Sequence, residues 1–105
     1  MQTKYVYLIN QVGTDLYKIG YAADVSKRLF SLQSGNPYRL RLIQIWRSHD
    51  AEKLEKWFHR ECRGYRKCRE WFQFTSLAII KLLDIHLQSP DLARKFGAYD
   101  LCNDE

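Results

Sequence analysis

The sequence places one carboxylate where a helix would present a hydrophobic side chain. Within residues 50–62, apolar side chains recur at about 100° per residue and form one stripe of a helix: Ala51, Leu54, Phe58 and Cys62. Glu55 falls in the middle of this stripe. Burying an ionised carboxylate costs on the order of several kcal/mol unless an arginine, hydrogen bonds or a metal ion offset that cost. Glu55 is therefore either half of a buried structural pair with an Arg or Tyr, or a metal ligand or catalytic carboxylate.

A second group of residues that could take part in binding is a run of cations. Tyr65 lies among five basic side chains: Arg60, Arg63, Arg66, Lys67 and Arg69. Clustered cations with an aromatic residue among them suit a phosphate backbone, although a solvated loop explains the charge equally well. The net charge of +5 and the pI of about 9.2 also suit a polyanionic partner.

The cysteines favour structural thiols. There are three, Cys62, Cys68 and Cys102, and an odd count argues against a disulfide framework. His59 together with Cys62 and Cys68 is a conceivable zinc site, but the spacing matches no common zinc finger. Buried thiols are the favoured interpretation.

Length and composition indicate one globular domain. The 105 residues suffice for a single domain, 1–105, with a core over 4–88 and a short helix and tail over 90–105. Hydrophobic residues make up 46% and charged residues 28%, which excludes a disordered chain. No apolar run approaches the ~18 residues that would span a membrane. The start of the chain lacks a signal-peptide pattern, so we expect a cytoplasmic protein without a membrane partner.

The first elements must position the candidate side chains. Residues 5–9 and 16–20 read as two strands of a hairpin, joined by a turn over 10–15. Alternation puts Tyr7 on one face with Tyr5 and Ile9, and puts Lys18 with Leu16 and Gly20. A lysine between apolar strand residues is unusual. It is either functional or a snorkelling side chain at a sheet edge.

A helix over 25–33 follows, capped by Asp24 and ended near Gly35 and Pro37. Arg28 borders its core-facing stripe. We therefore expect Arg28 to be partly buried and to meet Glu55 or a substrate charge beside it, while an ordinary surface arginine is the alternative.

The rest of the chain completes an α/β domain of the α+β type, with a small central three-stranded antiparallel sheet flanked by helices. Residues 38–46 are apolar on both faces and read as the central strand, with Arg39 and Arg41 near its start. After the Glu55 helix come a short extended segment at 70–74, an apolar core helix over about 77–85, and a short helix from Pro90. We expect the tail over 99–105 to be frayed.

The order of these motifs resembles the GIY-YIG endonuclease superfamily, and more narrowly its small branch in phages and bacteria. The resemblance covers residues 4–74. It rests on Tyr5-Val6-Tyr7, Tyr17-Lys18-Ile19-Gly20, Arg28, Gly35-Asn36-Pro37, Glu55 with His59, and Glu70-Trp71-Phe72.

The resemblance implies a DNA endonuclease that hydrolyses phosphodiester bonds with one divalent ion, Mg²⁺ or Mn²⁺. Glu55 would hold the metal ion and Arg28 would neutralise charge on the phosphate. Tyr7 would position or deprotonate the attacking water. Lys18 occupies the place of a second motif tyrosine and would lower the pKa of Tyr7. His59 would orient water or phosphate, with a core-edge histidine bonded to backbone as the alternative.

Further residues follow from the same resemblance. Gln73 is the nearest match to an asparagine that often follows the last strand, and Tyr17 is a secondary site residue. Tyr5 stands in place of the motif glycine. The expected DNA-binding residues are Asn36, Arg39, Arg41, Arg60, Arg63, Arg66, Lys67 and Arg69. A non-catalytic nucleic-acid-binding or inhibitory module is the alternative function, and the chain is expected to be a monomer or a homodimer.

Overall fold

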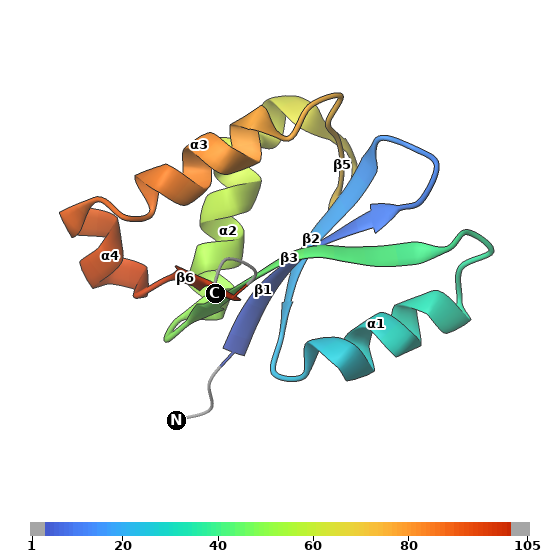
Figure 1. Cartoon of the computed structure of the whole chain (residues 1–105), viewed down its shortest axis with the longest axis horizontal. Coiled ribbons are helices and arrows are strands. Elements are labelled where there is room, and N and C mark those ends of the chain that lie inside the picture. Colours follow the sequence, from blue (N-terminus) through green and yellow to red (C-terminus); the bar gives the residue numbers. More distant parts are fainter. Residues whose placement is uncertain (1–3, 102–105) are drawn as a thin grey trace.

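A computed structural model describes residues 4–101 and shows an α+β fold built on one antiparallel sheet (Figure 1). Within the described residues the strand order is β4-β5-β2-β1-β3-β6. The strands are β1 (Lys4–Gln11), β2 (Leu16–Ala22), β3 (Leu40–Ser48), β4 (Arg66–Cys68), β5 (Trp71–Gln73) and β6 (Tyr99–Asp100). The predicted hairpin of residues 5–9 and 16–20 is confirmed as β1 and β2.

The prediction of three strands was wrong, because six strands form the sheet. The additional strands β4, β5 and β6 contain only two or three residues each, too few to show a period of two in the sequence. The segment predicted as the central strand, β3, also lies off centre, since β1 and β2 occupy the middle of the sheet. The tail is not frayed at its start: Tyr99 and Asp100 pair with β3. Residues 102–105 of that tail, including Cys102, lie outside the described residues.

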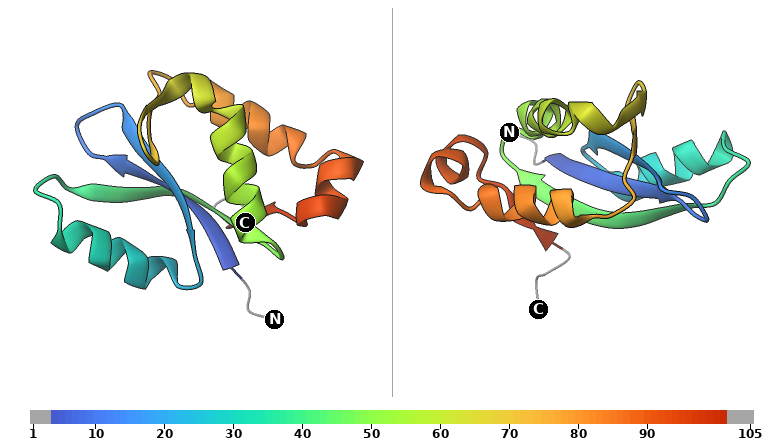
Figure 2. Two further views of the ribbon diagram at one scale, coloured as in Figure 1. Left: turned by 180° about the vertical axis from the view of Figure 1, so that it is seen from behind. Right: turned by 90° about the horizontal axis from the view of Figure 1, so that it is seen from above.

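Four helices cover the two faces of the sheet. They are α1 (Val25–Ser34), α2 (Ala51–Glu61), α3 (Ala78–His86) and α4 (Pro90–Phe96), and a short 3₁₀ turn, η1 (Arg63–Tyr65), follows α2. In Figure 1, α1 lies on one side of the sheet and α2, α3 and α4 lie on the other. Figure 2 shows the same arrangement from behind and from above. None of these helices is long and apolar enough to cross a membrane, judged over residues 4–101.

Side-chain caps fix where α1 and α2, the helices that carry Arg28 and Glu55, begin. The Asp24 carboxylate accepts a hydrogen bond from the backbone N–H of Lys27 at 3.0 Å, as the sequence predicts for α1. Asp50 does the same for the N–H of Lys53 at 3.3 Å and so fixes the start of α2. These caps set the rotation of both helices, and thereby the directions in which Arg28 and Glu55 project.

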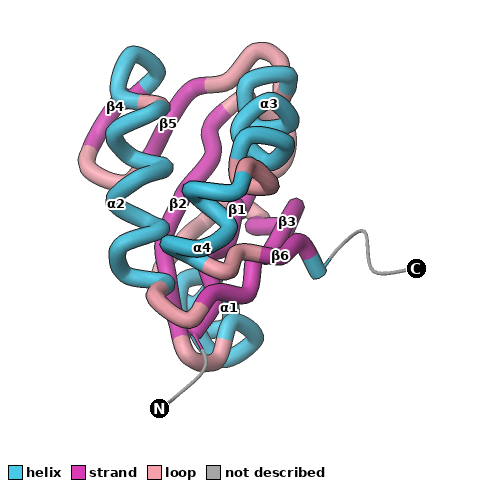
Figure 3. Tube along the Cα trace, turned by 90° about the vertical axis from the view of Figure 1, so that its left-hand side faces the viewer, coloured by secondary structure: helices cyan, strands magenta, loops and turns pink. Residues whose placement is uncertain are grey.

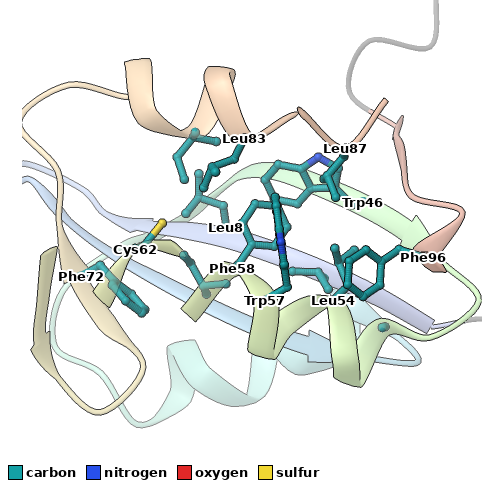
Figure 4. Packing of buried hydrophobic residues seen from close by; sticks show 14 of the residues in the cluster. Leu8, Trp46, Leu54, Trp57, Phe58, Cys62, Phe72, Leu83, Leu87 and Phe96 are labelled. Atoms are coloured by element: carbon teal, nitrogen blue, oxygen red, sulfur yellow. The ribbon is translucent and has the colours of Figure 1, made fainter. Parts of the chain in front are cut away.

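The larger core lies between the sheet and α2, α3 and α4 (Figure 4). Trp46 and Phe58 pack with ring centroids 4.6 Å apart, and Trp57 packs edge-on against Phe58 at 5.1 Å. The indole N–H of Trp46 donates to Asp84 of α3 at 2.9 Å, which satisfies a polar group at the border of this core. These contacts hold α2 rigidly on the sheet.

Two predictions about burial need correction. The apolar helix α3 is not wholly core, because Leu82 and Ile85 are 62% and 68% exposed while Ile80 and Leu83 are buried. Cys62 is buried as predicted, but Cys68 is exposed. Cys68 lies on the short edge strand β4, whose three residues are all exposed.

Candidate functional site

Tyr7 projects from the middle of β1 onto the face that α1 covers. Its Cα partner in the ladder is Gly20, whose missing side chain leaves room for the tyrosine ring. The ring is 1% exposed, and its hydroxyl accepts a hydrogen bond from the guanidinium of Arg28. Burial raises the pKa of Tyr7, and the Arg28 hydrogen bond and charge oppose this only in part. Tyr7 is therefore a neutral phenol at pH 7.

The position of Arg28 differs from the prediction. Arg28 is exposed rather than partly buried, and it contacts Tyr7 rather than Glu55. The reason is the layer arrangement: α1 and α2 lie on opposite faces of the sheet, so the guanidinium meets the side chain of its own face. The hydrogen bond to Tyr7 raises the pKa of Arg28, which keeps the guanidinium charged.

Lys18 is the buried cation of the site. It is 9% exposed and lies on the same face as Tyr7, because its ladder partner on β1 is Ile9. Its Nζ atom is 3.1 Å from Oε1 of Glu70 and 5.6 Å from the ring centroid of Trp71. β5 pairs with β2 at this position, so Lys18 is not a snorkelling side chain at a free edge.

The predicted effect of Lys18 on Tyr7 was wrong. The pKa of Tyr7 is raised by burial, and Lys18 is not among the groups that perturb it. The ammonium group of Lys18 is instead paired with the Glu70 carboxylate. Consequently Lys18 does not favour a tyrosinate.

Glu55 is half-buried on α2, the helix that lies beside β2 (Figure 3). Within residues 4–101 its carboxylate accepts no hydrogen bond and forms no ion pair, so the buried structural pair with an Arg or Tyr does not exist. Burial raises the pKa of Glu55, His59 and Lys18 lower it, and Glu70 raises it further. The carboxylate thus lies near Lys18, His59 and two other acids, Glu70 and Glu52, without being neutralised by direct contact.

His59 joins α2 to the edge of β2. Its Nε2 atom lies 2.8 Å from the carbonyl oxygen of Ile19, which can only accept, so Nε2 carries the proton. Its Nδ1 atom then accepts from the guanidinium of Arg66 at 3.3 Å. Both ring nitrogens have protein partners, and the bond to the Ile19 carbonyl is the one expected for a core-edge histidine bonded to backbone. His59 thus ties α2 to β2 one turn after Glu55.

Glu70 is the site residue that the sequence interpretation left out of its list. It pairs with Lys18 and acts electrostatically on Tyr7, Arg28 and Glu55. Its backbone carbonyl also accepts from the N–H of Ile19 at 3.1 Å. The available signal was its place in the Glu-Trp-Phe motif beside a strand, combined with the need of a buried lysine for a counter-ion.

The remaining predicted residues have other surroundings. Tyr17 points to the opposite face and packs on Phe74, with ring centroids 5.7 Å apart. The amide of Gln73 donates to the Asp15 carboxylate at 3.2 Å and so holds the β1–β2 turn. The Asn36 side chain accepts from the N–H of Tyr38 at 2.9 Å and shapes the loop after α1.

The predicted DNA-binding cations are all exposed and form two groups. One group follows the end of α2 through η1 to the turn after β4: Arg60, Arg63, Arg66, Lys67 and Arg69. The other group, Arg39 and Arg41, lies at the start of β3, beyond β2 and β1 in the strand order. Only Arg66 in the first group touches a site residue, His59.

One set of side chains, carried by β1, β2, α1, α2 and the residue before β5, is linked by electrostatic effects around β2, although α1 and α2 lie on opposite faces of the sheet. We call it the edge cluster, and it consists of Tyr7, Lys18, Arg28, Glu55 and Glu70. It contains two cations, two carboxylates and one phenol, connected by the Arg28–Tyr7 hydrogen bond and the Lys18–Glu70 ion pair. Such a set can bind a phosphate group and a divalent cation side by side.

Comparison with known families changes the identification made from the motifs. The sequence model of the T5orf172 domain matches residues 4–86. This domain is distinct from GIY-YIG, for which no family match is found, so the resemblance to that superfamily was wrong as an assignment. The motifs that suggested it are two to four residues long and are individually weak. No curated protein and no solved structure gives a significant match to the chain.

Proposed function

The chain belongs to the T5orf172 domain family, and we propose that its edge cluster hydrolyses phosphodiester bonds of DNA with the help of one divalent metal ion. The observation that carries the proposal is the state of Glu55. This carboxylate is half-buried, costs desolvation energy, and has no hydrogen-bond or ion-pair partner among residues 4–101. A half-buried carboxylate that has no structural partner is available to bind a ligand such as a metal ion.

The donor set fits Mg²⁺ or Mn²⁺. Mg²⁺ keeps several waters and needs only one or two carboxylates together with phosphate oxygens. Glu55 would hold the ion, and no group of three His, Cys, Asp or Glu side chains that could form a protein cage occurs among the described residues. When bound, the ion would supply Lewis acidity and lower the pKa of a coordinated water.

Arg28, held by Tyr7, would bind the phosphate. The guanidinium of Arg28 is exposed and permanently charged, so it can pair with the non-bridging oxygens of a phosphate as negative charge increases on them. Tyr7 orients that guanidinium through its hydroxyl oxygen. Because Tyr7 is enclosed and remains protonated, it would act by orienting Arg28 and not as the base.

Lys18 and Glu70 would preserve the electrostatic balance of the site. Lys18 is buried and cannot reach far into solvent, and Glu70 holds it at 3.1 Å beside Trp71. The pair places a positive charge near Glu55 and lowers the repulsion that two nearby acids would otherwise exert on an incoming phosphate. These two residues are therefore assigned to positioning and charge balance.

The partner we propose is DNA, bound mainly through its backbone. The exposed cations from Arg60 to Arg69 continue directly from the helix that carries Glu55. Cations of this kind contact phosphates without reading sequence. A monomer with one edge cluster would make one cut at a time, so nicking is the expected product and double-strand cleavage would need a dimer or two events.

Conversion of supercoiled plasmid to the nicked form tests the proposal. Wild type should nick in Mg²⁺ or Mn²⁺ and not in EDTA, and Glu55→Gln should bind DNA without nicking. Glu52→Gln is the matched control, since Glu52 is an exposed acid on the same helix and lies outside the edge cluster. Equal nicking by wild type and Glu55→Gln would refute the assignment of Glu55.

A non-catalytic binding module is the second candidate, because the exposed cations do not depend on Glu55. It predicts that wild type and Glu55→Gln bind DNA equally and that neither protein nicks with any divalent ion. Loss of salt-sensitive binding in Arg63→Gln or Lys67→Gln, without any metal dependence, would then identify the function.

A further inference from the structure

A basic hollow lies between α2 and α4, outside the edge cluster. It has a volume of about 170 Å³ and is lined by Lys53, Lys56, Trp57, Arg60, Lys95 and Phe96. Four of these six residues are cations and none is acidic. Within the expected DNA-binding set only Arg60 belongs to it, so the hollow is a separate feature of the surface.

The two helices build the hollow through their aromatic contact. Trp57 of α2 and Phe96 of α4 pack with ring centroids 6.0 Å apart (Figure 4). Lys53, Lys56 and Arg60 follow one flank of α2 at spacings of three and four residues, so they line up beside that contact. Lys95 adds a cation from α4, with its Nζ atom 5.4 Å from the Phe96 ring centroid.

The cations on α2 are available to a ligand. Each has an acidic neighbour outside the hollow: Asp50 at 3.7 Å from Lys53, Glu52 at 3.8 Å from Lys56, and Glu61 at 3.7 Å from Arg60. The basic side chains are 72%, 72% and 61% exposed in these pairs. Exposed ion pairs contribute little to the free energy of unfolding. A phosphate can therefore displace the acidic partner from each cation with little loss of stability.

The aromatic residues show which part of a nucleic acid fits. Trp57 is 5% exposed and Phe96 is 1% exposed, so neither ring offers a face on which a base could stack. The reachable groups are ammonium and guanidinium groups, which bind phosphate oxygens. The hollow therefore suits a backbone phosphate and carries no means of reading a base.

We propose that this hollow binds a backbone phosphate of the DNA on the far flank of α2 from Glu55; this rests on the proposed function. Glu55 and His59 lie on the β2 side of α2, while the hollow lies on its α4 side. A helix with side chains is about 10–12 Å wide. With about 3.4 Å per nucleotide along one strand, that width corresponds to roughly three nucleotides between the hollow and the cut bond.

Binding of a fluorescein-labelled duplex, measured by anisotropy in EDTA between about 50 and 200 mM NaCl, tests this proposal. The test variant is Lys56→Gln/Lys95→Gln. Its control is Lys27→Gln/Lys81→Gln, which removes the same charge from exposed positions on α1 and α3. Log K falls as log salt rises, and each lost phosphate contact makes this slope less steep by about 0.9. The slope of the test variant should be less steep by about 0.9 and that of the control should not change, while Lys56→Arg/Lys95→Arg should keep the wild-type slope.

The outcomes separate this proposal from the proposed function. Equal slopes in the test and control variants would overturn the hollow as a phosphate site, even if wild type nicks plasmid and Glu55→Gln does not. A reduced slope confined to the test variant would support the hollow, even if no protein nicks plasmid. Absence of duplex binding by wild type would overturn both.

Discussion

A Cβ atom at Gly20 would lie 2.6 Å from Cζ of Tyr7 and closer still to its hydroxyl oxygen. The two residues are ladder partners on β2 and β1, so the tyrosine ring occupies the space that any larger residue at position 20 would need. Glycine at this position is therefore a condition for the Tyr7–Arg28 hydrogen bond.

Gly20→Ala should displace the Tyr7 ring, which is fully enclosed and has no empty space to enter. We expect a loss of about 1–3 kcal/mol in the free energy of unfolding, as for other overpacked sites, together with loss of nicking. Urea unfolding and plasmid nicking check this. Gly35→Ala is the control, since a Cβ there meets nothing within 4 Å and the backbone has φ −98°. A Gly20→Ala protein as stable and active as the control would contradict the close approach.

Glu55→Gln should not destabilise the metal-free protein at pH 7. Burial raises the pKa of Glu55 in the folded state above the unfolded value of about 4.3. The folded state therefore binds more protons between the two pKa values, and the contribution of this carboxyl to stability falls as pH rises through that window. Above that pH window, the ionised carboxylate lowers the free energy of unfolding, and Gln removes this destabilising charge. Lys18 and Arg28 retain their contacts with Glu70 and Tyr7.

Thermal unfolding in EDTA from pH 4 to pH 8 checks this prediction. The melting temperature of Glu55→Gln should equal or exceed that of wild type at pH 7, and the difference should shrink toward pH 4. Addition of Mg²⁺ should raise the melting temperature of wild type more than that of the variant, by mass action. A variant that melts well below wild type at pH 7 would mean that Glu55 is a structural acid.

Arg28→Ala should slow nicking about 10²–10³-fold, the usual effect of losing one donor to a developing negative charge. Because Arg28 is exposed, the melting temperature of the Arg28→Ala protein should differ little from that of wild type. Lys27→Ala removes a neighbouring exposed cation from the same helix and should leave the rate near that of wild type. A large fall in melting temperature accompanying the loss of activity would show that Arg28 acts through the fold.

The Lys18–Glu70 pair should show coupling in a double-mutant cycle. Glu70→Gln leaves a 9% exposed ammonium group without its carboxylate, whereas Lys18→Met removes the charge itself. Glu70→Gln should therefore be the more destabilising single change, and the double variant should recover part of the loss. We expect a coupling energy between about 0.5 and 3 kcal/mol from urea unfolding. Additive single effects would mean that the ion pair contributes nothing.

The sequence by itself determined most local structure and one member of the site. Alternation over residues 5–9 and 16–20 predicts the hairpin, and the structure confirms it; that Tyr7 and Lys18 share a face follows only from the strand register. The cap Asp24 predicts where α1 begins. Helical periodicity also singles out Glu55, which it puts in the middle of the apolar stripe of α2, whereas the structure leaves Glu55 only half-buried. These features depend on residues within one or two turns of one another, which is the range over which backbone geometry fixes side-chain direction.

Only the tertiary structure decided which side chains meet. Pairing of β5 with β2 brings Glu70 to Lys18 across more than fifty residues, and the layers direct Arg28 to Tyr7 instead of Glu55. Packing of Phe96 on Trp57 creates the basic hollow from two helices that are distant in sequence. The strands β4, β5 and β6 are too short to carry a periodic signal, and their places depend on hydrogen bonds to distant partners. Such contacts form because apolar burial and strand pairing must be satisfied for the whole chain at the same time. A pattern within a short stretch of sequence does not contain that information.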